Sequence, residues 1–173
     1  MSPLEKIEIK IMPDLETAEK VISGWKSNNE KIVFTNGCFD LFHAGHAHAL
    51  AESAKFGSKL IVGINDDLSV KSLKGPTRPF NSLKSRALVL ASLEVVDLVI
   101  PFSDENPENL IRRIIPDVLA KGNDYTLENI AGAAFVLENK GEVALIPLIP
   151  DLSSTNIASL IFEKMTSNAN KNP

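Results

Sequence analysis

The sequence has little of what marks several large classes of protein. It holds one cysteine, Cys38, so no disulfide can form within the chain, which is typical of a reducing compartment. Lys and Arg number 18 against 22 Asp and Glu, giving a net charge of −4. No Lys/Arg run supplies the basic face that a phosphate-backbone binder uses. We therefore expect no nucleic-acid partner.

Long apolar stretches are also missing. No segment approaches the ~20 consecutive apolar residues that a membrane-spanning helix needs, so we expect no membrane association. Residues 1–10 alternate charged and apolar side chains, unlike a secretory signal peptide. These absences predict a cytoplasmic protein. The patterns G-x-x-x-x-G-K-[ST] and G-x-G-x-x-G do not occur, which excludes P-loop and dinucleotide-binding motifs.

Short apolar runs alternate with helical patterns along the chain. The runs lie at 31–36, 59–65, 95–101, 117–121 and 142–147. Helices are predicted at 44–56, 82–94, 106–113 and 127–139. Strands that are apolar on both faces are typical of a buried parallel sheet. The alternation predicts an α/β fold, a Rossmann-like doubly wound parallel sheet of five strands with helices on both faces.

The length of 173 residues suits one packed domain, which we expect at residues 31–165. Residues 1–30 are predicted to form a helical extension. Its helix, at 14–29, places Leu15, Ala18, Ile22 and Trp25 on one stripe. Residues 166–173 are polar, and we expect them to form a flexible tail.

Two histidines follow the first predicted strand. His43 and His46 stand at i and i+3 at the start of a helix, so they face the same way. They can donate to phosphates where the helix N-terminus already favours negative charge, and Gly45 leaves room for a flat base or ribose. Fixed donors of this kind stabilise the charge that builds during nucleotidyl transfer. One alternative is a metal site formed by His43, His46 and Asp40, although zinc usually takes ligands from a second segment. The other is that both histidines are core residues without a functional role.

A run of hydroxyl side chains opens a helix after the last predicted strand. Ser153, Ser154 and Thr155 can hold the β- and γ-phosphates there, or can simply cap the helix. Between the two motifs, Lys74 and Arg78 lie in a turn-rich loop. That loop either closes over a triphosphate, with Lys74 neutralising charge, or carries solvated surface charge.

Arg86 and Asp40 are charged residues whose positions predict the groups that they contact. Arg86 lies on the apolar side of its helix, where a guanidinium requires a structural carboxylate or a ligand phosphate. A carboxylate at Asp40 would repel phosphates, so we expect it to face sugar hydroxyls or a cation. A polar segment follows the fourth predicted strand, on the other side of the point where the strand order is expected to reverse. Its side chains either contact the nucleotide or the acceptor, or they simply form a turn. This segment comprises Lys121, Gly122, Asn123, Asp124 and Tyr125.

The two motifs resemble those of the cytidylyltransferase-like nucleotidyltransferase superfamily. Its members share a Rossmann-type sheet and an HxGH signature that binds the triphosphate. In this sequence the signature is resembled by Gly37-Cys38-Phe39-Asp40 followed by His43-Ala44-Gly45-His46. Ser154-Thr155-Asn156-Ile157 resembles the later S-T-T-x-I stretch, although Asp151-Leu152 stands where a Gly often precedes it. The resemblance implies nucleotide binding by Asn36, Gly37, Cys38, Phe39, His43, Gly45, His46, Lys121, Gly122, Asp124, Ser153, Ser154 and Thr155.

The intermediate segments resemble heptose 1-phosphate adenylyltransferases more closely. The likeness covers about residues 30–160 and includes Lys74-Gly75, Arg78-Pro79 and Lys121-Gly122-x-Asp124-Tyr125. It implies transfer of AMP from ATP to a heptose 1-phosphate, giving ADP-heptose and pyrophosphate for lipopolysaccharide or surface glycans. Implied catalytic residues are His43, His46 and Lys74. Implied substrate-binding residues are Asp40, Asp67, Lys74, Arg78 and Arg86.

The resemblance also implies partners. Mg²⁺ is expected mainly on the ATP phosphates, with no metal held by the protein, because no carboxylate cluster has metal-ligand spacing. Relatives are often dimers, which allows a homodimer. Many are fused to a sugar-kinase domain, for which this sequence has no residues, so the stand-alone form is expected.

Two alternative functions remain open. A cytidylyltransferase acting on glycerol or ribitol phosphate would use the same two motifs. Such enzymes resemble R-T-x-G-x-S-T-T at the second motif, whereas no arginine follows Arg113 here. A nucleotide-binding domain without turnover is the other alternative. A class I aminoacyl-tRNA synthetase, which shares the histidine signature, would need a far longer chain.

Overall fold

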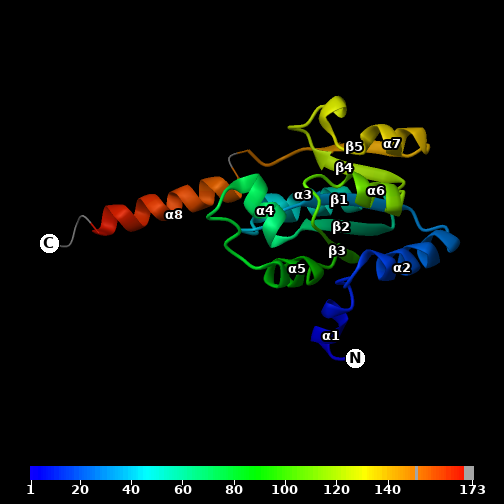
Figure 1. The fold of residues 1–173 in the computed structure, drawn as a ribbon, viewed down its shortest axis with the longest axis horizontal. Coiled ribbons are helices and arrows are strands. Elements are labelled where there is room, and N and C mark those ends of the chain that lie inside the picture. Colours follow the sequence, from blue (N-terminus) through cyan, green and yellow to red (C-terminus); the bar gives the residue numbers. More distant parts are fainter. Residues whose placement is uncertain (151, 170–173) are drawn as a thin grey trace.

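The computed structural model describes residues 1–150 and 152–169, with side chains to residue 167. Five parallel strands form one sheet in the order β3-β2-β1-β4-β5 (Figure 1). They are β1 (Ile32–Gly37), β2 (Lys59–Asn65), β3 (Leu98–Phe102), β4 (Val118–Gly122) and β5 (Glu142–Ile146). The strand order reverses between β1 and β4, as in a doubly wound sheet. The predicted fold class is therefore confirmed.

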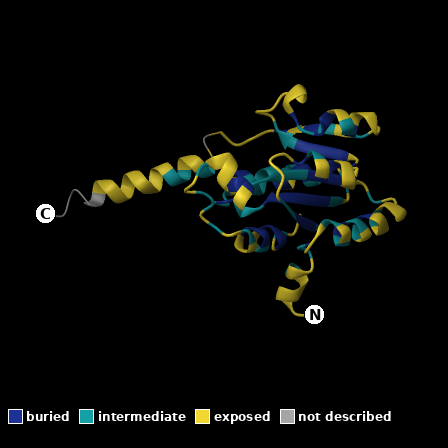
Figure 2. Ribbon diagram, viewed as in Figure 1, coloured by how far each residue is buried: buried dark blue, intermediate teal, exposed yellow. Residues whose placement is uncertain are grey.

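Helices cover both faces of this sheet because alternate strand residues are apolar on both sides. Ile32 and Phe34 of β1 pack into a core with α2 (Leu15–Ser27), α6 (Glu108–Ile114) and α7 (Ala133–Glu138). Val33 faces the opposite core, with α3 (Ala44–Ala54) and α5 (Leu83–Ala91). All three strand residues are completely buried. Figure 2 shows the strands of the sheet mostly in the colour of buried residues.

Three helical regions differ from the sequence-based expectation. α1 (Pro3–Glu8) and α4 (Asp67–Lys74) were not predicted, because each is a short helix begun by a cap rather than marked by a long apolar stripe. Ser2 caps α1, and Asp66 accepts from the Ser69 N–H at 2.7 Å to cap α4. The helix predicted at 127–139 is divided into η1 (Leu127–Asn129) and α7 by Gly132, which has φ +83°.

The N-terminal extension does more than pack against the domain. Its helix α2 lies within the predicted range, but residues 10–12 also pair with the outer strand β3. The Met12 N–H donates to the Val99 carbonyl at 2.9 Å, and the Val99 N–H donates to the Lys10 carbonyl at 2.8 Å. These bonds cover backbone groups that an edge strand would otherwise leave unpaired.

The last helix, α8 (Ser154–Ala169), begins beside α3 and then projects from the body of the molecule (Figure 1). Most of its described length is exposed (Figure 2). Residues 166–169 belong to this helix, whereas residues 170–173 and Asp151 lie outside the described residues, so the flexible tail expected at 166–173 stays a prediction. No helix among the described residues is both long and apolar enough to cross a bilayer.

Candidate active site

A cavity of about 550 Å³ lies over the carboxyl ends of β1, β2 and β4, where a doubly wound sheet binds its ligands. Most of the residues expected at the site line it. They are Asn36, Gly37, Cys38, Phe39, Asp40, His43, Gly45, His46, Lys74, Arg78, Lys121, Ser153, Ser154 and Thr155. Four expected residues do not line it: Asp67, Arg86, Gly122 and Asp124.

The histidine pair stands at the N-terminus of α3. His43 is the N-cap residue, and its ring stacks on that of His46 with centroids 3.8 Å apart and planes at 22°. Gly45 is buried between them. A Cβ there would lie 3.0 Å from the His43 ring and 3.3 Å from Leu152 Cβ, so glycine permits this close packing. The expected room for a base or ribose is thus partly taken by protein atoms.

Burial controls the protonation of both rings. It lowers the pKa of His46 to about 4, with His43 contributing, and it also lowers the pKa of His43. Phe39 and Phe42 flank His46 at centroid distances of 5.1 and 5.5 Å. Both imidazoles are therefore neutral at pH 7. The Nδ1 atoms of His43 and His46 are buried without a hydrogen-bond partner in the described part of the chain, which is uncommon for buried polar atoms.

The start of α8 meets the start of α3 at this cavity. The Ser154 hydroxyl donates to the Leu41 carbonyl at 3.1 Å, which ties the two segments together. The Asn156 N–H donates to Ser153 Oγ at 3.0 Å, so Ser153 also caps the helix. Two helix N-termini, each favourable to negative charge, thus line one cavity.

Lys121 links the two central strands at the floor of the cavity. Its Nζ donates to Asn36 Oδ1, from β4 to β1. Burial lowers the pKa of Lys121 to about 8, and Asp124 and Cys38 oppose the shift. Its ammonium lies 5.8 Å from the Tyr125 ring centre. Among the described residues it forms no salt bridge, which leaves a cation for an anionic ligand.

Asp40 is placed differently from the expectation. Its carboxylate accepts from the Arg78 Nε, from the Phe80 N–H at 2.8 Å and from the Asn81 N–H at 2.9 Å. Burial raises the pKa of Asp40, but these donors outweigh it and the pKa lies below its usual value. With 3% of its surface exposed and both oxygens bonded, Asp40 fixes the 78–81 loop instead of facing sugar hydroxyls or a metal.

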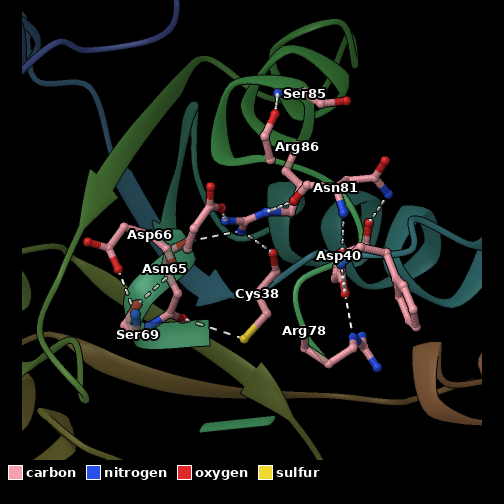
Figure 3. A network of polar contacts seen from close by, with 12 residues as sticks. Cys38, Asp40, Asn65, Asp66, Ser69, Arg78, Asn81, Ser85 and Arg86 are labelled. Carbon is pink, nitrogen blue, oxygen red and sulfur yellow. Dashed lines mark hydrogen bonds and ion pairs between the residues drawn. The ribbon is translucent and has the colours of Figure 1, made fainter. Parts of the chain in front are cut away.

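Arg86 has protein partners instead of a phosphate, one of the two alternatives that its position allowed. It is 2% exposed, and its guanidinium donates to Asp67 Oδ1 at 2.7 Å. Figure 3 shows the same side chain bonded to the carbonyls of Cys38, Asn65 and Asn81. Arg86 and Asp67 therefore join the ends of β1 and β2 to α4 and α5, and they do not touch the cavity.

The turn after β4 is only partly as expected. Lys121 lines the cavity, but Gly122 and Asp124 do not. A Cβ at Gly122 would lie 2.5 Å from Asp124 Oδ1, so the Asp124 side chain lies directly over the glycine. Tyr125, from the same segment, also lines the cavity. This fits the alternative interpretation of Gly122 and Asp124 as turn residues.

Several residues were missed by the sequence analysis. They come from α3, α4, the end of β2, the loop after β3, the segment after β4 and the loop before α8. They are Ala49, Asn65, Leu73, Glu105, Asn106, Pro107, Asn129, Ile130, Ala131, Leu148, Ile149 and Leu152. The carboxyl ends of parallel strands share one edge, so Asn65 and the loop after β3 could have been found from that rule.

Metal ligands are not grouped at this site. Within the described residues, no cluster of three or more His, Cys, Asp and Glu side chains could hold a metal ion. The alternative set of His43, His46 and Asp40 also lacks a free carboxylate, because Asp40 is bonded to the 78–81 loop. The arrangement suits anion binding by helix N-termini, imidazoles and Lys121.

Comparisons with known proteins agree with this arrangement. The bifunctional protein HldE of Pectobacterium carotovorum is 48% identical over 146 residues, covering 84% of this chain and 30% of that protein. HldE of Caulobacter vibrioides is 48% identical over 150 residues, covering 87% of this chain and 31% of that protein. The chain thus spans about a third of the length of the curated relatives it matches.

Two solved structures share the fold. Pantoate-beta-alanine ligase from Francisella tularensis, complexed with an ATP ligand and beta-alanine, has a TM-score of 0.62 at 17% identity. That match covers 88% of this chain and 77% of the ligase. A lipopolysaccharide core biosynthesis protein from Thermoplasma volcanium has a TM-score of 0.54 at 24% identity, covering 69% of this chain and 97% of that one. The cytidylyltransferase-like family model matches residues 34–160, most of the chain, and the chain belongs to this family.

Proposed function

We propose that this chain transfers AMP from ATP to a heptose 1-phosphate, giving ADP-heptose and pyrophosphate for lipopolysaccharide or surface-glycan synthesis. The observation that carries the proposal is the meeting of two helix N-termini, α3 with His43 and His46 and α8 with Ser153 and Ser154, at one cavity. A triphosphate is the ligand whose charge and length suit two such anion-binding ends. The resemblance at residues 74–79 and 121–125 supports the heptose acceptor.

The reaction needs no covalent enzyme intermediate. An oxygen of the acceptor phosphate attacks the α-phosphorus of ATP in line, forming a new O–P bond while the bond to the bridging oxygen breaks. The bonding pair leaves with pyrophosphate. His43 and His46, neutral in the free protein, would donate hydrogen bonds to the oxygens on which charge builds. Catalysis is then mainly positioning and electrostatic stabilisation.

Cations around the cavity would complete the site. Lys74 and Arg78 line it from the side of α4, and Lys121 lines its floor. We propose that Lys74 neutralises the triphosphate during transfer and that Lys121 binds nucleotide. Mg²⁺ would arrive as part of the MgATP substrate, held by phosphate oxygens. Arg86 and Asp67 are positioning residues in this scheme, because they hold the strand ends and not the ligand.

A pyrophosphate-release panel tests the proposal. Four nucleoside triphosphates are combined with heptose, hexose, glycerol and ribitol phosphates. We expect turnover with ATP and a heptose 1-phosphate above all other pairs. Preference for CTP with glycerol or ribitol phosphate would contradict the adenylyltransferase assignment. Binding of ATP without pyrophosphate release from any pair would instead indicate a nucleotide-binding domain.

Two further properties are part of the proposal. ATP and sugar phosphates are metabolites of the cytoplasm, so we expect the protein to act there. A homodimer is expected from the resemblance alone. Light scattering of the purified protein would test it, and a mass of one chain would contradict it.

A further inference from the structure

Two carboxylates line the cavity among the described residues, and they differ in what they can still bind. Asp40 is buried, and both of its oxygens accept hydrogen bonds from the 78–81 loop. Glu105 is exposed, and its hydrogen bond is a long one, from the Ser72 hydroxyl to Oε1 at 3.4 Å. Of these two carboxylates, Glu105 is therefore the one that can accept further hydrogen bonds from a ligand.

Glu105 lies in the half of the cavity that is next to β2 and β3. The Asp66 N–H donates to the Phe102 carbonyl at 2.9 Å, so the loop that carries Glu105 leaves β3 beside the end of β2. The strand order places β2 and β3 on one side of β1 and β4 on the other (Figure 1). Glu105, Asn106 and Asn65 thus lie on the side opposite to Lys121 and Tyr125.

The two halves differ in chemistry. The half beyond β4 offers the aromatic ring of Tyr125 and the apolar Ile130 and Ala131, which suit a flat base. The half beyond β2 offers the amides of Asn65 and Asn106 and the Glu105 carboxylate, which suit hydroxyl groups, and the segment after β2 adds the cations Lys74 and Arg78. A negative Glu105 also repels phosphates. A ligand with one phosphate and several hydroxyls would therefore lie with its hydroxyls toward Glu105 and its phosphate toward the histidines.

We propose that Glu105 accepts hydrogen bonds from the hydroxyl tail of the sugar-phosphate acceptor and sets the preference for an acceptor that carries a terminal diol. The inference rests on the proposed function, since it concerns the acceptor of the same reaction. A carboxylate with two oxygens matches a vicinal diol, whereas a sugar that ends one carbon earlier leaves the carboxylate without that partner.

The test is a comparison of Glu105→Gln with wild type on two acceptors. One is a heptose 1-phosphate, and the other is the hexose 1-phosphate with the same ring and one carbon fewer. We expect Glu105→Gln to raise KM for the heptose about tenfold, the order expected for loss of a charge-assisted hydrogen bond. The KM for ATP should stay unchanged, and the preference for heptose over hexose should shrink by a similar factor.

Asp104→Asn is the matched control. Asp104 is the neighbouring carboxylate, it accepts from Asn109 Nδ2 at 3.1 Å, and it does not line the cavity. Its variant should keep the wild-type KM for both acceptors. A second variant, Glu105→Ala, should reproduce the effect of Glu105→Gln if the carboxylate itself is what matters.

The possible outcomes separate the two proposals. Wild-type protein that uses no sugar phosphate would contradict the proposed function. Active wild type with an unchanged acceptor KM in Glu105→Gln would contradict only the role of Glu105. A rise in the KM for ATP instead would place Glu105 on the nucleotide and overturn the inference.

Discussion

At the scale of single residues, His43 and His46 are the groups on which the proposed reaction depends most. Their rings stack, and a buried Nδ1 atom on each has no hydrogen-bond partner among the described residues. Replacing either by Ala removes a donor to the charge that develops in the transition state, so we expect kcat to fall about a hundredfold. Steady-state kinetics with circular dichroism of each variant measures this. A folded variant with wild-type turnover would rule out the assigned role.

Lys121 predicts a pH dependence. Its pKa of about 8 lies below the usual lysine value, so the ammonium is charged at pH 7 and loses its proton as the pH rises through 8. We expect the affinity for ATP to weaken between pH 7 and pH 9, because the cavity loses a cation. Titration calorimetry at several pH values measures this.

Lys121→Met is the control for the pH experiment. It should bind ATP more weakly at pH 7 and show a flatter profile up to pH 9. A wild-type profile that is retained in Lys121→Met would assign the pH dependence to another group.

At the scale of elements, Arg86 connects four segments of the chain. Its completely buried guanidinium donates to three carbonyls and to Asp67 (Figure 3). Arg86→Ala leaves the three carbonyls without this donor and opens a space in the core, so we expect the free energy of unfolding to fall by about 3–5 kcal/mol. Urea unfolding measures it. Asp67→Asn should cost much less, because the Asp67 side chain is 48% exposed; equal losses would contradict this account.

The elements also show what the sequence can predict. The five strands were predicted because buried parallel strands are apolar on both faces, as β1 and β2 are. Helices α1 and α4 were missed because a single cap residue starts each of them. The partners of Asp40 were not predictable, because they depend on a loop that returns about 40 residues later along the chain. The pattern of apolar residues indicates which face of a strand or helix is buried. It does not indicate which side chains meet across a loop, because that depends on the course of the chain in the folded protein.

At the scale of the whole molecule, the proposed nucleotide site joins segments that are far apart in the sequence. Because α3 and α8 both line the cavity, ATP should stabilise the native protein by binding it and not the unfolded chain. At MgATP about 100 times its Kd, we expect about 2.7 kcal/mol of added stability. Thermal unfolding with and without MgATP measures the rise in Tm. His46→Ala should show a smaller rise at the same concentration, and an equal rise would place ATP elsewhere.

The bond between Ser154 and the Leu41 carbonyl has a consequence for synthesis on the ribosome. The histidine pair leaves the ribosome well before the serines of the proposed phosphate site, because 107 positions separate His46 from Ser153. A nascent chain that already holds β1 to β3 and α3 still lacks α8, and a domain generally folds as a unit. If ATP binds at the proposed site, it can therefore stabilise the domain only after α8 has been synthesised, and it cannot stabilise an earlier intermediate.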